Sequence, residues 1–535
     1  FAKQSDHIRV VKIQANGDVF CAGGDLKNMW SKNDETTSTV PKIGDVEDIS
    51  LMIRNLNKPV LSKIQGNVLA GSQDDTLVNK FYVNSGDGLF VDHTVGSGAD
   101  DSGYGIGVAT GDYNNDGWVD LFVTNYGRNS LLRNDGDLTF TDVTEEAGLT
   151  EVAFSACASF ADLDLDGDLD LFVTNYLDWT TDTEKPCFSE QNRQDYCNPA
   201  SYSAPIADTF YVNNGDGTFS NATQLSGIDL IAGTGLGVGI APLNDDNLPD
   251  IFVANDGMED HLWINSGDGT FKEEALMRGC AVDNTGKEKA SMGVLLRDLN
   301  HDQSIDVLVT TLFRETDSLF VNEDGVFLDS TARFGLAADT RTFTRWGVVA
   351  EDFNNDGIVD IYEATGRVRW QADNWDPNDW LAEPNLLFTG SEGNRFSLVV
   401  PSGGTSEPLI YAAHGVASGD LDNDGGMDLV IVNKDAKVNI LLNTIFNEGN
   451  WIILEVLNSF GSPALGASVV VELEDGSVYS EYIQTQQGYA SSSDPRVHLG
   501  LGSENSVRSV SVKWADGSQS LFEGLEAGLI HQLRQ

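Results

Sequence analysis

Short acidic segments recur along the chain at spacings that would let carboxylates bind a cation. The clearest is DLDLDGDLD at 162–170, in which five aspartates occupy every second position. On a strand these like charges would share one face and repel one another. The apolar run LFVTNY follows at once, so the charge lies beside a predicted core. A group of opposite charge is therefore expected to neutralise the segment.

Five further segments align with this one. They are GDYNNDGWVDLFVT at 111–124, APLNDDNLPDIFVA at 241–254, RDLNHDQSIDVLVT at 297–310, EDFNNDGIVDI at 351–361 and GDLDNDGGMDLVIV at 419–432. Their shared pattern is D-x-[DN]-x-D-G-x-x-D. Oxygen ligands in a short loop bent by glycine suit a hard cation, and Ca²⁺ best of all. The alternative is a set of plain Asx turns, in which Asp and Asn cap their own backbone.

Each loop is expected to supply side-chain ligands from positions 1, 3, 5 and 9 and a backbone carbonyl from position 7. The complete loops are Asp112, Asn114, Asp116, Trp118 and Asp120; Asp162, Asp164, Asp166, Asp168 and Asp170; Asp352, Asn354, Asp356, Ile358 and Asp360; and Asp420, Asp422, Asp424, Gly426 and Asp428. A fifth loop keeps its ligands but has Gln303 where glycine is expected: Asp298, Asn300, Asp302, Ser304 and Asp306. A sixth has Pro242 at position 1, which leaves Asn244, Asp246 and Asp250. We therefore expect about five Ca²⁺ sites and a weak or empty sixth.

An EF-hand shares the first half of this pattern but requires a glutamate at position 12 and flanking helices. Position 12 is valine or isoleucine in the four loops that end at Val123, Val173, Val309 and Ile431. Only the loop that begins at Asp352 has a glutamate there, Glu363. Because strands are expected after every loop, the pattern excludes an EF-hand for most of them.

The elements that position these loops form a repeat of four short strands. A second pattern, such as FYVNNGDGTF at 210–219 and LWINSGDGTF at 262–271, alternates with the loops and predicts a tight hairpin. Successive loops begin 50 to 80 residues apart, which suits β-propeller blades with insertions. A β-solenoid or a row of small β modules is the alternative. Seven blades are favoured and six are the alternative, because the hairpin at 81–94 has no loop before it; residues 60–80 or those after 443 would complete its blade.

The chain divides into three parts. Residues 78–445 carry the repeats, and residues 446–535 read as alternating strands of a separate small β domain. Residues 1–73 instead predict a short α/β segment, with IRVVKIQ and KPVLSKIQG as strands and DVEDISLMIRNLN as a helix. Within the insertion at 177–205, Cys187 and Cys197 stand ten residues apart. They either form a local disulfide, which suits an oxidising compartment, or remain free thiols.

The charge of the chain is lopsided: 83 Asp and Glu against 32 Lys and Arg give a net charge of −51. This argues against nucleic acid or an anionic membrane as a partner, since both need basic patches. Cations, high salt or a basic partner fit better. No apolar stretch reaches about 18 residues, so no transmembrane segment is expected. The N-terminus, FAKQSDHIRVVKI, does not read as a signal peptide.

The loops and the interleaved hairpins resemble FG-GAP (VCBS-type) repeats, the calcium-binding units of integrin-like propellers. The segments NWIILEVLNSFGSPALGASVVVEL, QGYASSSDPRVHLGLG and VSVKWADGSQSLFEGL are similar to the ASPIC/UnbV domain. Together they resemble the cartilage acidic protein family and its bacterial relatives over about residues 78–535. The resemblance implies a mainly β fold, an integrin-like propeller plus a small C-terminal β domain. It also implies a secreted or surface calcium-binding protein with adhesion or matrix roles, and a cysteine pair such as Cys187 and Cys197.

Residues 1–73 resemble part of the crotonase (enoyl-CoA hydratase/isomerase) family through FCAGGDLKNM and KPVLSKIQGNVLAGS. In that family two backbone amides form an oxyanion hole for an acyl-CoA thioester. Gly24 and Gly71 would hold the corresponding positions. The family's catalytic acids would lie beyond Ser72, where the repeats take over, so we read the segment as non-catalytic.

These observations favour an extracellular or cell-surface calcium-binding propeller that acts as a binding, adhesion or scaffold protein for a protein or glycan ligand. The seven histidines are scattered, so no catalytic residue is assigned and no enzyme is expected. A carbohydrate-binding or carbohydrate-active propeller is the alternative, because spaced tryptophans such as Trp370, Trp375 and Trp380 often stack on sugars. They would equally serve to pack the insertion at 366–385. An acyl-CoA hydratase or isomerase is a remote alternative.

Overall fold

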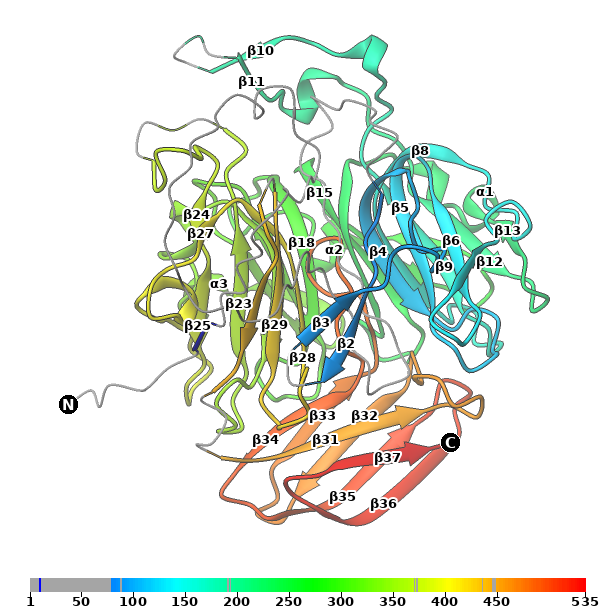
Figure 1. Cartoon of the computed structure of the whole chain (residues 1–535), viewed down its shortest axis with the longest axis vertical. Helices are drawn as coiled ribbons and strands as arrows, with labels where there is room; N and C mark the ends of the chain where they lie inside the picture. Colours follow the sequence, from blue (N-terminus) through cyan, green and yellow to red (C-terminus); the bar gives the residue numbers. More distant parts are fainter. Residues whose placement is uncertain are drawn as a thin grey trace, which may run out of the picture.

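The computed structural model of the chain describes residues 9–10, 78–86, 89–189, 192, 194–369, 371, 374–434, 436–444 and 449–535. Short antiparallel sheets are arranged about a central axis, and a second β domain lies at one end of that axis (Figure 1). The mainly β fold and the propeller expected from the repeats are confirmed. The segments predicted within residues 1–73, with Gly24 and Gly71, lie outside the described residues apart from the two-residue strand β1 (Arg9–Val10).

In the described residues the propeller contains six units of three or four consecutive repeat strands that pair side by side. Their strands are β4 (Tyr104–Gly111), β5 (Asp120–Arg128), β6 (Ser130–Asn134), β7 (Phe140–Asp142); β8 (Val152–Ala161), β9 (Asp170–Asn175), β12 (Thr209–Asn213), β13 (Phe219–Asn221); β14 (Gly235–Ala241), β15 (Asp250–Met258), β16 (His261–Asn265), β17 (Phe271–Glu273); β18 (Lys289–Arg297), β19 (Asp306–Thr311), β20 (Ser318–Glu323), β21 (Val326–Asp329); β22 (Arg345–Glu351), β23 (Asp360–Thr365), β25 (Leu386–Thr389), β26 (Ser397–Leu398); and β28 (Ala413–Gly419), β29 (Asp428–Asn433), β30 (Asn439–Leu442). β1 pairs with β30 as the fourth strand of the last unit. The first and second units, and the third and fourth, are also joined edge to edge into eight-stranded sheets.

The innermost strand of each blade is buried and approaches the next blade closely. A β-carbon on Gly237 of β14 would lie 2.2 Å from the carbonyl oxygen of Met292, and one on Gly293 of β18 would lie 2.2 Å from that of Trp346. Only glycine allows backbones to meet at this distance. The glycines of the inner strands therefore set the tight spacing of blades around the axis.

A repeated asparagine links four of the six described blades to the blade before. The side-chain amide of Asn213 donates to the carbonyl of Tyr113 (2.8 Å), and Asn265 does the same to Leu163 (2.7 Å). The hairpin of β2 (Tyr82–Gly86) and β3 (Leu89–Asp92) repeats this bond after the sixth blade. There, Asn84 donates to the carbonyl of Leu421 at 2.7 Å. The hairpin thus has the contacts of the outer half of a seventh blade.

The residues that would complete this seventh blade were expected at 60–80 or after 443. Residues after 449 instead form the second domain, so that route to a complete blade is wrong. Residues 60–77 lie outside the described part of the chain. The described residues thus hold six blades and half of another.

The C-terminal domain is a sandwich of two sheets (Figure 1). One sheet joins β34 (Val497–Gly502), β31 (Asn450–Leu457) and β37 (Ile530–Arg534); the other joins β33 (Val478–Tyr482), β32 (Ser468–Leu473), β35 (Ser506–Lys513) and β36 (Gln519–Glu526). Its apolar residues share one buried cluster with Tyr113, Phe122 and Phe219 of the propeller. The sandwich is therefore packed onto the propeller rather than tethered beside it.

A loop of the sandwich, residues 484–494, enters the centre of the propeller. Gly488 exchanges two backbone hydrogen bonds with Val294 of β18, 2.7 and 3.0 Å long. The hydroxyls of Thr485 and Ser492 donate to the carbonyls of Thr110 and Val108 on β4, at 3.0 and 3.1 Å. These bonds satisfy inner-strand groups that would otherwise face the channel. We call residues 484–494 the central plug.

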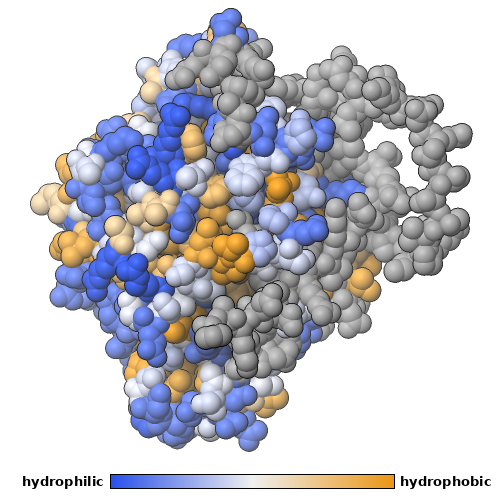
Figure 2. Space-filling model, turned by 90° about the vertical axis from the view of Figure 1, so that its left-hand side faces the viewer, coloured by the Kyte–Doolittle hydropathy of each residue, from blue (hydrophilic) through white to orange (hydrophobic). Residues whose placement is uncertain are grey.

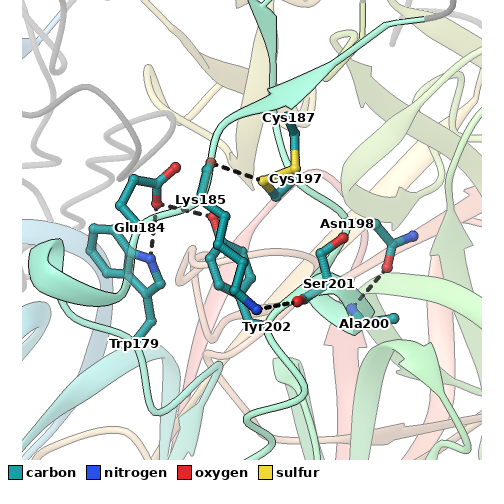
Figure 3. Close-up of a disulfide and its surroundings, with 9 residues drawn as sticks. All are labelled: Trp179, Glu184, Lys185, Cys187, Cys197, Asn198, Ala200, Ser201 and Tyr202. Carbon is teal, nitrogen blue, oxygen red and sulfur yellow. Dashed lines mark hydrogen bonds between the residues drawn. A yellow bond between two sulfur atoms is a disulfide. The ribbon is translucent and has the colours of Figure 1, made fainter.

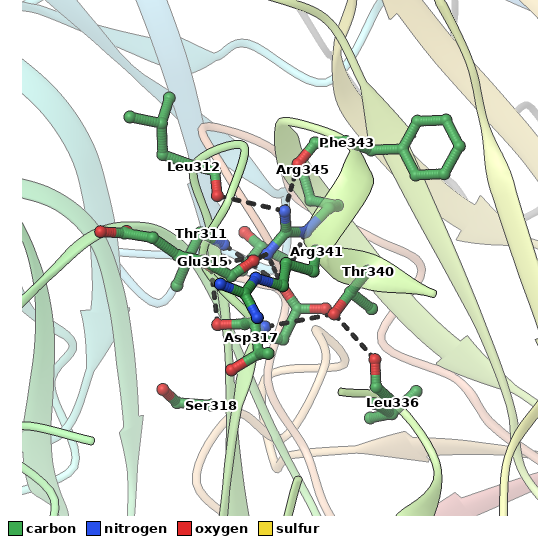
Figure 4. Close-up of polar contacts among 12 residues, drawn as sticks. Thr311, Leu312, Glu315, Asp317, Ser318, Leu336, Thr340, Arg341, Phe343 and Arg345 are labelled. Atoms are coloured by element: carbon green, nitrogen blue, oxygen red, sulfur yellow. Dashed lines mark hydrogen bonds and ion pairs between the residues drawn. The ribbon is translucent and has the colours of Figure 1, made fainter. Parts of the chain in front are cut away.

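A fully buried ion pair joins the fourth and fifth blades (Figure 4). Nε of Arg345 donates to Oδ1 of Asp317 at 2.9 Å, and Nη2 donates to the hydroxyl of Thr311 at 2.6 Å. Burial, followed by the charge of Asp317, raises the pKa of Glu363 well above its usual range. Glu363, the one glutamate at position 12 of a loop, therefore belongs to this cluster and not to an EF-hand.

The other elements are short. The helices are α1 (Thr223–Ser226), α2 (Ala275–Arg278), α3 (Thr331–Phe334), η3 (Thr181–Thr183), η4 (Pro199–Ser201), η5 (Ile228–Leu230), η6 (Thr340–Thr342) and η7 (Ser402–Gly404), and the minor strands are β10 (Cys187–Phe188), β11 (Gln194–Asp195), β24 (Glu383–Pro384) and β27 (Ile410–Tyr411). None of the helices in the described residues has the length and apolarity needed to cross a bilayer. The face in Figure 2 is mostly hydrophilic, with small apolar patches between polar residues.

Candidate metal sites

The first aspartate of each complete loop folds the loop around its own carboxylate. Asp162 is 4% exposed, and its two oxygens accept the amides of Asp166 (3.1 Å) and Gly167 (3.0 Å). The same pair of bonds forms at Asp112, Asp298, Asp352 and Asp420. Five loops therefore share one curled backbone, as their common sequence pattern predicts.

This curl requires left-handed backbone at positions 4 and 6. Position 6 has φ of 99° at Gly167 and 89° at Gly357, which glycine adopts without strain. Gln303 holds the same position with φ of 71°. A side chain is disfavoured there, so this loop keeps the fold of its sisters at an energetic cost.

The last aspartate of each loop joins the loop to the next hairpin. Asp170 accepts the amide of Leu163 at 3.1 Å and that of Asn213 at 2.8 Å. Equivalent bonds form at Asp120, Asp250, Asp306, Asp360 and Asp428. Position 9 is thus a buried structural acceptor as well as a candidate ligand, a role that the sequence pattern alone did not indicate.

Carboxylate oxygens converge in two of the loops. Atoms of Asp162, Asp164 and Asp166 lie within 4.8 Å of one another, as do atoms of Asp420, Asp422 and Asp428. One oxygen of Asp422 is buried without a hydrogen-bond partner among the described residues. In two of the loops with asparagine at position 3, Asn114 and Asn354 donate to the position-5 aspartate. Hard oxygen donors in this arrangement fit Ca²⁺.

The side chain at position 7 points away from this cluster. The carboxylate of Asp168 accepts the side-chain amide of Asn115, in the loop of the neighbouring blade, at 2.6 Å. Its amide donates to Asp166 at 2.9 Å. The sister positions hold Trp118, Ser304, Ile358 and Gly426, which share no ligating side chain. The geometry is consistent with a ligand role for the backbone carbonyl only.

Each loop places several carboxylates close together in a partly buried position. Burial, opposed by the amide of Asn213 and reinforced by neighbouring aspartates, raises the pKa of Asp170 to about 8. Burial likewise raises the pKa of Asp162 to about 6 and that of Asp352 to about 7. Ionised carboxylates are disfavoured here unless a positive charge accompanies them.

The loop at 242–250 lacks the carboxylate at position 1. Asn244 accepts the amide of Asp246 at 2.8 Å, and Asp246 accepts that of Leu248 at 2.9 Å. Asp250 keeps its bonds to the hairpin. The bonds made by the aspartate at position 9 therefore persist although the ligand at position 1 is missing.

The sandwich docks on the face of the propeller that carries the loops. The hydroxyl of Ser480 donates to Asp298 at 3.1 Å. Arg496 donates to the carbonyl of Asp420 and to the side chain of Asn423, both at 2.9 Å. A change in the shape of these loops would therefore alter the contacts that hold the sandwich on the propeller.

At the opposite end of the propeller, the insertion after β9 is closed by a disulfide between Cys187 and Cys197 (Figure 3). Glu184 accepts the indole of Trp179 (2.9 Å) and the hydroxyl of Tyr202 (3.0 Å). Cys157 and Cys280 are buried and unpaired. In the other insertion, Trp375 stacks on Phe343 at 6.1 Å; Trp370 lies outside the described residues.

Comparison with known families supports the organisation inferred from the repeats. The FG-GAP-like repeat model matches residues 112–173, 243–309 and 298–363, and the ASPIC and UnbV model matches residues 459–535. The chain combines FG-GAP-like repeats with an ASPIC and UnbV region. The enoyl-CoA hydratase/isomerase model matches residues 1–82. The three resemblances noted in the sequence are thus confirmed.

Among curated proteins, cartilage acidic protein 1 of Xenopus tropicalis is 27% identical over 330 residues, which cover 57% of this chain and 46% of that protein. The human protein of the same name is 26% identical over 302 residues, covering 53% and 41%. The chain therefore spans less than half the length of these relatives.

Two solved structures share a general likeness. The V. cholerae biofilm matrix protein Bap1 is 10% identical with a TM-score of 0.30, covering 87% of this chain and 62% of that one. The extracellular domain of the putative hybrid two component system BT3049 from B. thetaiotaomicron is 10% identical with a TM-score of 0.36, covering 89% and 55%.

Proposed function

We propose that the chain is an extracellular binding or scaffold protein whose propeller is stabilised by about five Ca²⁺ ions, one in each loop with an aspartate at position 1. The observation that carries the proposal is the common curl of these loops, with carboxylates converging within 4.8 Å in two of them. The disulfide of the insertion supports an oxidising compartment. Five ions would reduce the net charge from −51 to about −41.

Calcium in this proposal acts on both domains. The loops that would bind the ion also hold the sandwich, through Ser480 on Asp298 and Arg496 on the loop at 420. An ion that binds only the folded loop stabilises it by RT ln(1 + [L]/Kd), about 2.7 kcal/mol when the ion is present at 100 times Kd. Calcium would therefore strengthen the contact between the propeller and the sandwich as well as the blades.

The exposed surface of the propeller, with its two insertions, would provide the adhesive or ligand-binding face. This role needs no catalytic group, and among the described residues the histidines remain scattered: His261 and His498 lie buried in different domains. The partner would be a protein or a glycan.

A thermal melt of the whole chain with and without a chelator tests the calcium proposal. We expect EGTA to lower the melting temperature, excess Ca²⁺ to restore it and Mg²⁺ to restore it poorly, because Mg²⁺ demands a smaller octahedral site. Calorimetric titration should count about five sites. An unchanged melting temperature in EGTA, with no heat on adding Ca²⁺, would overturn the proposal.

A further inference from the structure

A cavity of about 140 Å³ lies on the axis of the propeller, beneath the disulfide-closed insertion. The inner strand of each of the six described blades contributes to its lining, through Ile106, Phe154, Leu236, Met292, Trp346 and His414. Figure 1 places this insertion at the end of the propeller opposite to the sandwich. The cavity is therefore separate from the calcium loops.

Two segments from outside the blades close the cavity. Tyr489 of the central plug forms its floor, and its ring packs on that of Trp346 with centroids 4.9 Å apart. Cys197 and Tyr202 of the insertion line it from the other side. The chain thus assembles the cavity from all six blades, the plug and the insertion.

The walls are mostly aromatic. Trp346 also packs against the ring of His414 (4.4 Å), and Phe154 meets Tyr176 edge to face (5.2 Å). Aromatic faces carry partial negative charge, so they attract a cation once it has left water.

Two polar side chains in the cavity, Asp256 and His414, restrict which ligand it can bind. The half-buried carboxylate of Asp256 accepts the hydroxyl of Tyr176 at 2.7 Å and has no ion pair among the described residues. His414 is 2% exposed, and its Nε2 has no hydrogen-bond partner in the described part of the chain. Burial lowers the pKa of His414 to about 3, so its ring is neutral. A negative charge and a neutral hydrogen-bonding nitrogen therefore face one aromatic space.

We propose that this cavity binds a small methylated ammonium compound that carries a hydroxyl group, of which choline is the simplest example. The methyl groups would contact the aromatic walls, the charge would lie near Asp256, and the hydroxyl would bond to Nε2 of His414. A sugar needs more polar partners than the cavity offers, and a purely apolar ligand would leave the half-buried carboxylate of Asp256 with no positive charge inside the cavity.

The charge of the whole chain, −51, adds to the attraction for a cation. Arg369 at the rim of the cavity opposes it, since this exposed side chain is close enough for its charge to stabilise the ionised form of Asp256. The two charges therefore make opposite contributions that substitutions can separate.

Calorimetric titration of the whole chain with choline chloride tests this proposal, at pH 8 in saturating Ca²⁺. Sodium chloride, glucose and cyclohexanol at matched concentrations serve as ligand controls. We expect choline alone to bind, and tetramethylammonium, which lacks the hydroxyl, to bind more weakly. No binding of choline up to about 10 mM, or binding of glucose or cyclohexanol in its place, would overturn the proposal.

Three variants locate the site. Asp256→Asn keeps an acceptor for Tyr176 and should weaken choline binding at least tenfold. Arg369→Gln, on an exposed side chain, should tighten it about two- to threefold. Asp229→Asn, an exposed aspartate outside the cavity, should leave it unchanged. If Asp256→Asn and Asp229→Asn behave alike, or if Arg369→Gln weakens binding, the cavity is not the site.

Discussion

The assignment of ligands within one loop can be tested with two aspartates that stand two positions apart. Asp166 belongs to the converging cluster with Asp162 and Asp164, whereas the carboxylate of Asp168 bonds to Asn115 of the preceding blade. Replacing each by asparagine removes one negative charge and keeps an acceptor. Asp168→Asn is therefore a matched control for Asp166→Asn.

The expected magnitude follows from mass action. If free Ca²⁺ is about 100 times Kd, one site contributes about 2.7 kcal/mol. Should the loss of the Asp166 charge raise Kd by about 100-fold, the remaining contribution would be about 0.4 kcal/mol. Asp166→Asn should thus remove about 2.3 kcal/mol of calcium-dependent stability, and Asp168→Asn should change it by less than about 0.5 kcal/mol because Asn115 still finds an acceptor.

Calorimetric titration of chelator-treated protein measures this directly. We expect about five sites in the unsubstituted chain, the same number in Asp168→Asn, and one fewer in Asp166→Asn within the same range of concentration. Melting curves in EGTA should nearly coincide for the two variants, since neither loop then holds an ion. Equal losses of Ca²⁺ in both variants would refute the assignment of position 7, and no loss in either would refute the site in this loop.

Three further predictions follow from other parts of the molecule. Gln303→Gly should raise the free energy of unfolding by about 0.5–1 kcal/mol in urea melts, because the left-handed backbone there (φ of 71°) disfavours a side chain; a loss of stability would contradict this. Gly488→Ala should destabilise the packing of the sandwich on the propeller and increase hydrogen exchange in the central plug, because a β-carbon at Gly488 would lie 2.6 Å from the backbone of Val348; unchanged exchange would contradict it. Burial raises the pKa of Asp208 from 3.8 to about 7, so the folded state releases this proton at a higher pH than the unfolded state does and the unsubstituted chain loses stability between these values. Asp208→Asn should therefore become more stable relative to the unsubstituted chain as the pH rises from about 4 through 7. Melts at pH 5 and 8.5 that show the same difference in stability would refute this prediction.

The acceptor position that Asp208 occupies recurs in other blades of the propeller. The amide of Asn175 donates to Asp208 at 3.0 Å, and the equivalent acceptors in two other blades are Asn129 (2.8 Å) and Asn385 (3.0 Å). Sister blades thus already use the neutral amide in this place. The carboxylate adds no bond that the amide lacks, and its burial makes ionisation unfavourable.

The sequence predicts the blades and the curl of the loops because both are local and repeated. Each depends on residues within about ten positions of one another, such as the aspartate at position 1 and the amides of positions 5 and 6. A repeat that recurs six times makes the pattern visible in one sequence. The disulfide between Cys187 and Cys197 is local in the same sense.

The central plug and the cavity were not predicted, because they join residues far apart in the chain. Gly488 and Val294 are brought together only when the sandwich docks on the loops. The run QQGYASSSD at 486–494 gave a weak signal: small residues without alternation between two strands are unusual unless a backbone must pass close to its neighbours. Asp256, His414 and Trp346 lie in three different blades, and none stands in a loop whose pattern draws attention to it.

The two ends of the propeller differ in what they contact and, in our proposals, in what they bind. At one end, buried aspartates fold the loops and hold the sandwich, and an ion there acts on stability. At the other end, the axis opens into a cavity whose floor, Tyr489, is carried by that same sandwich. If calcium fixes the sandwich in place, then it also fixes the floor of the cavity. Removing calcium should therefore weaken choline binding even though no calcium loop touches the cavity, and a choline affinity that is unchanged in EGTA would show that the two ends are independent.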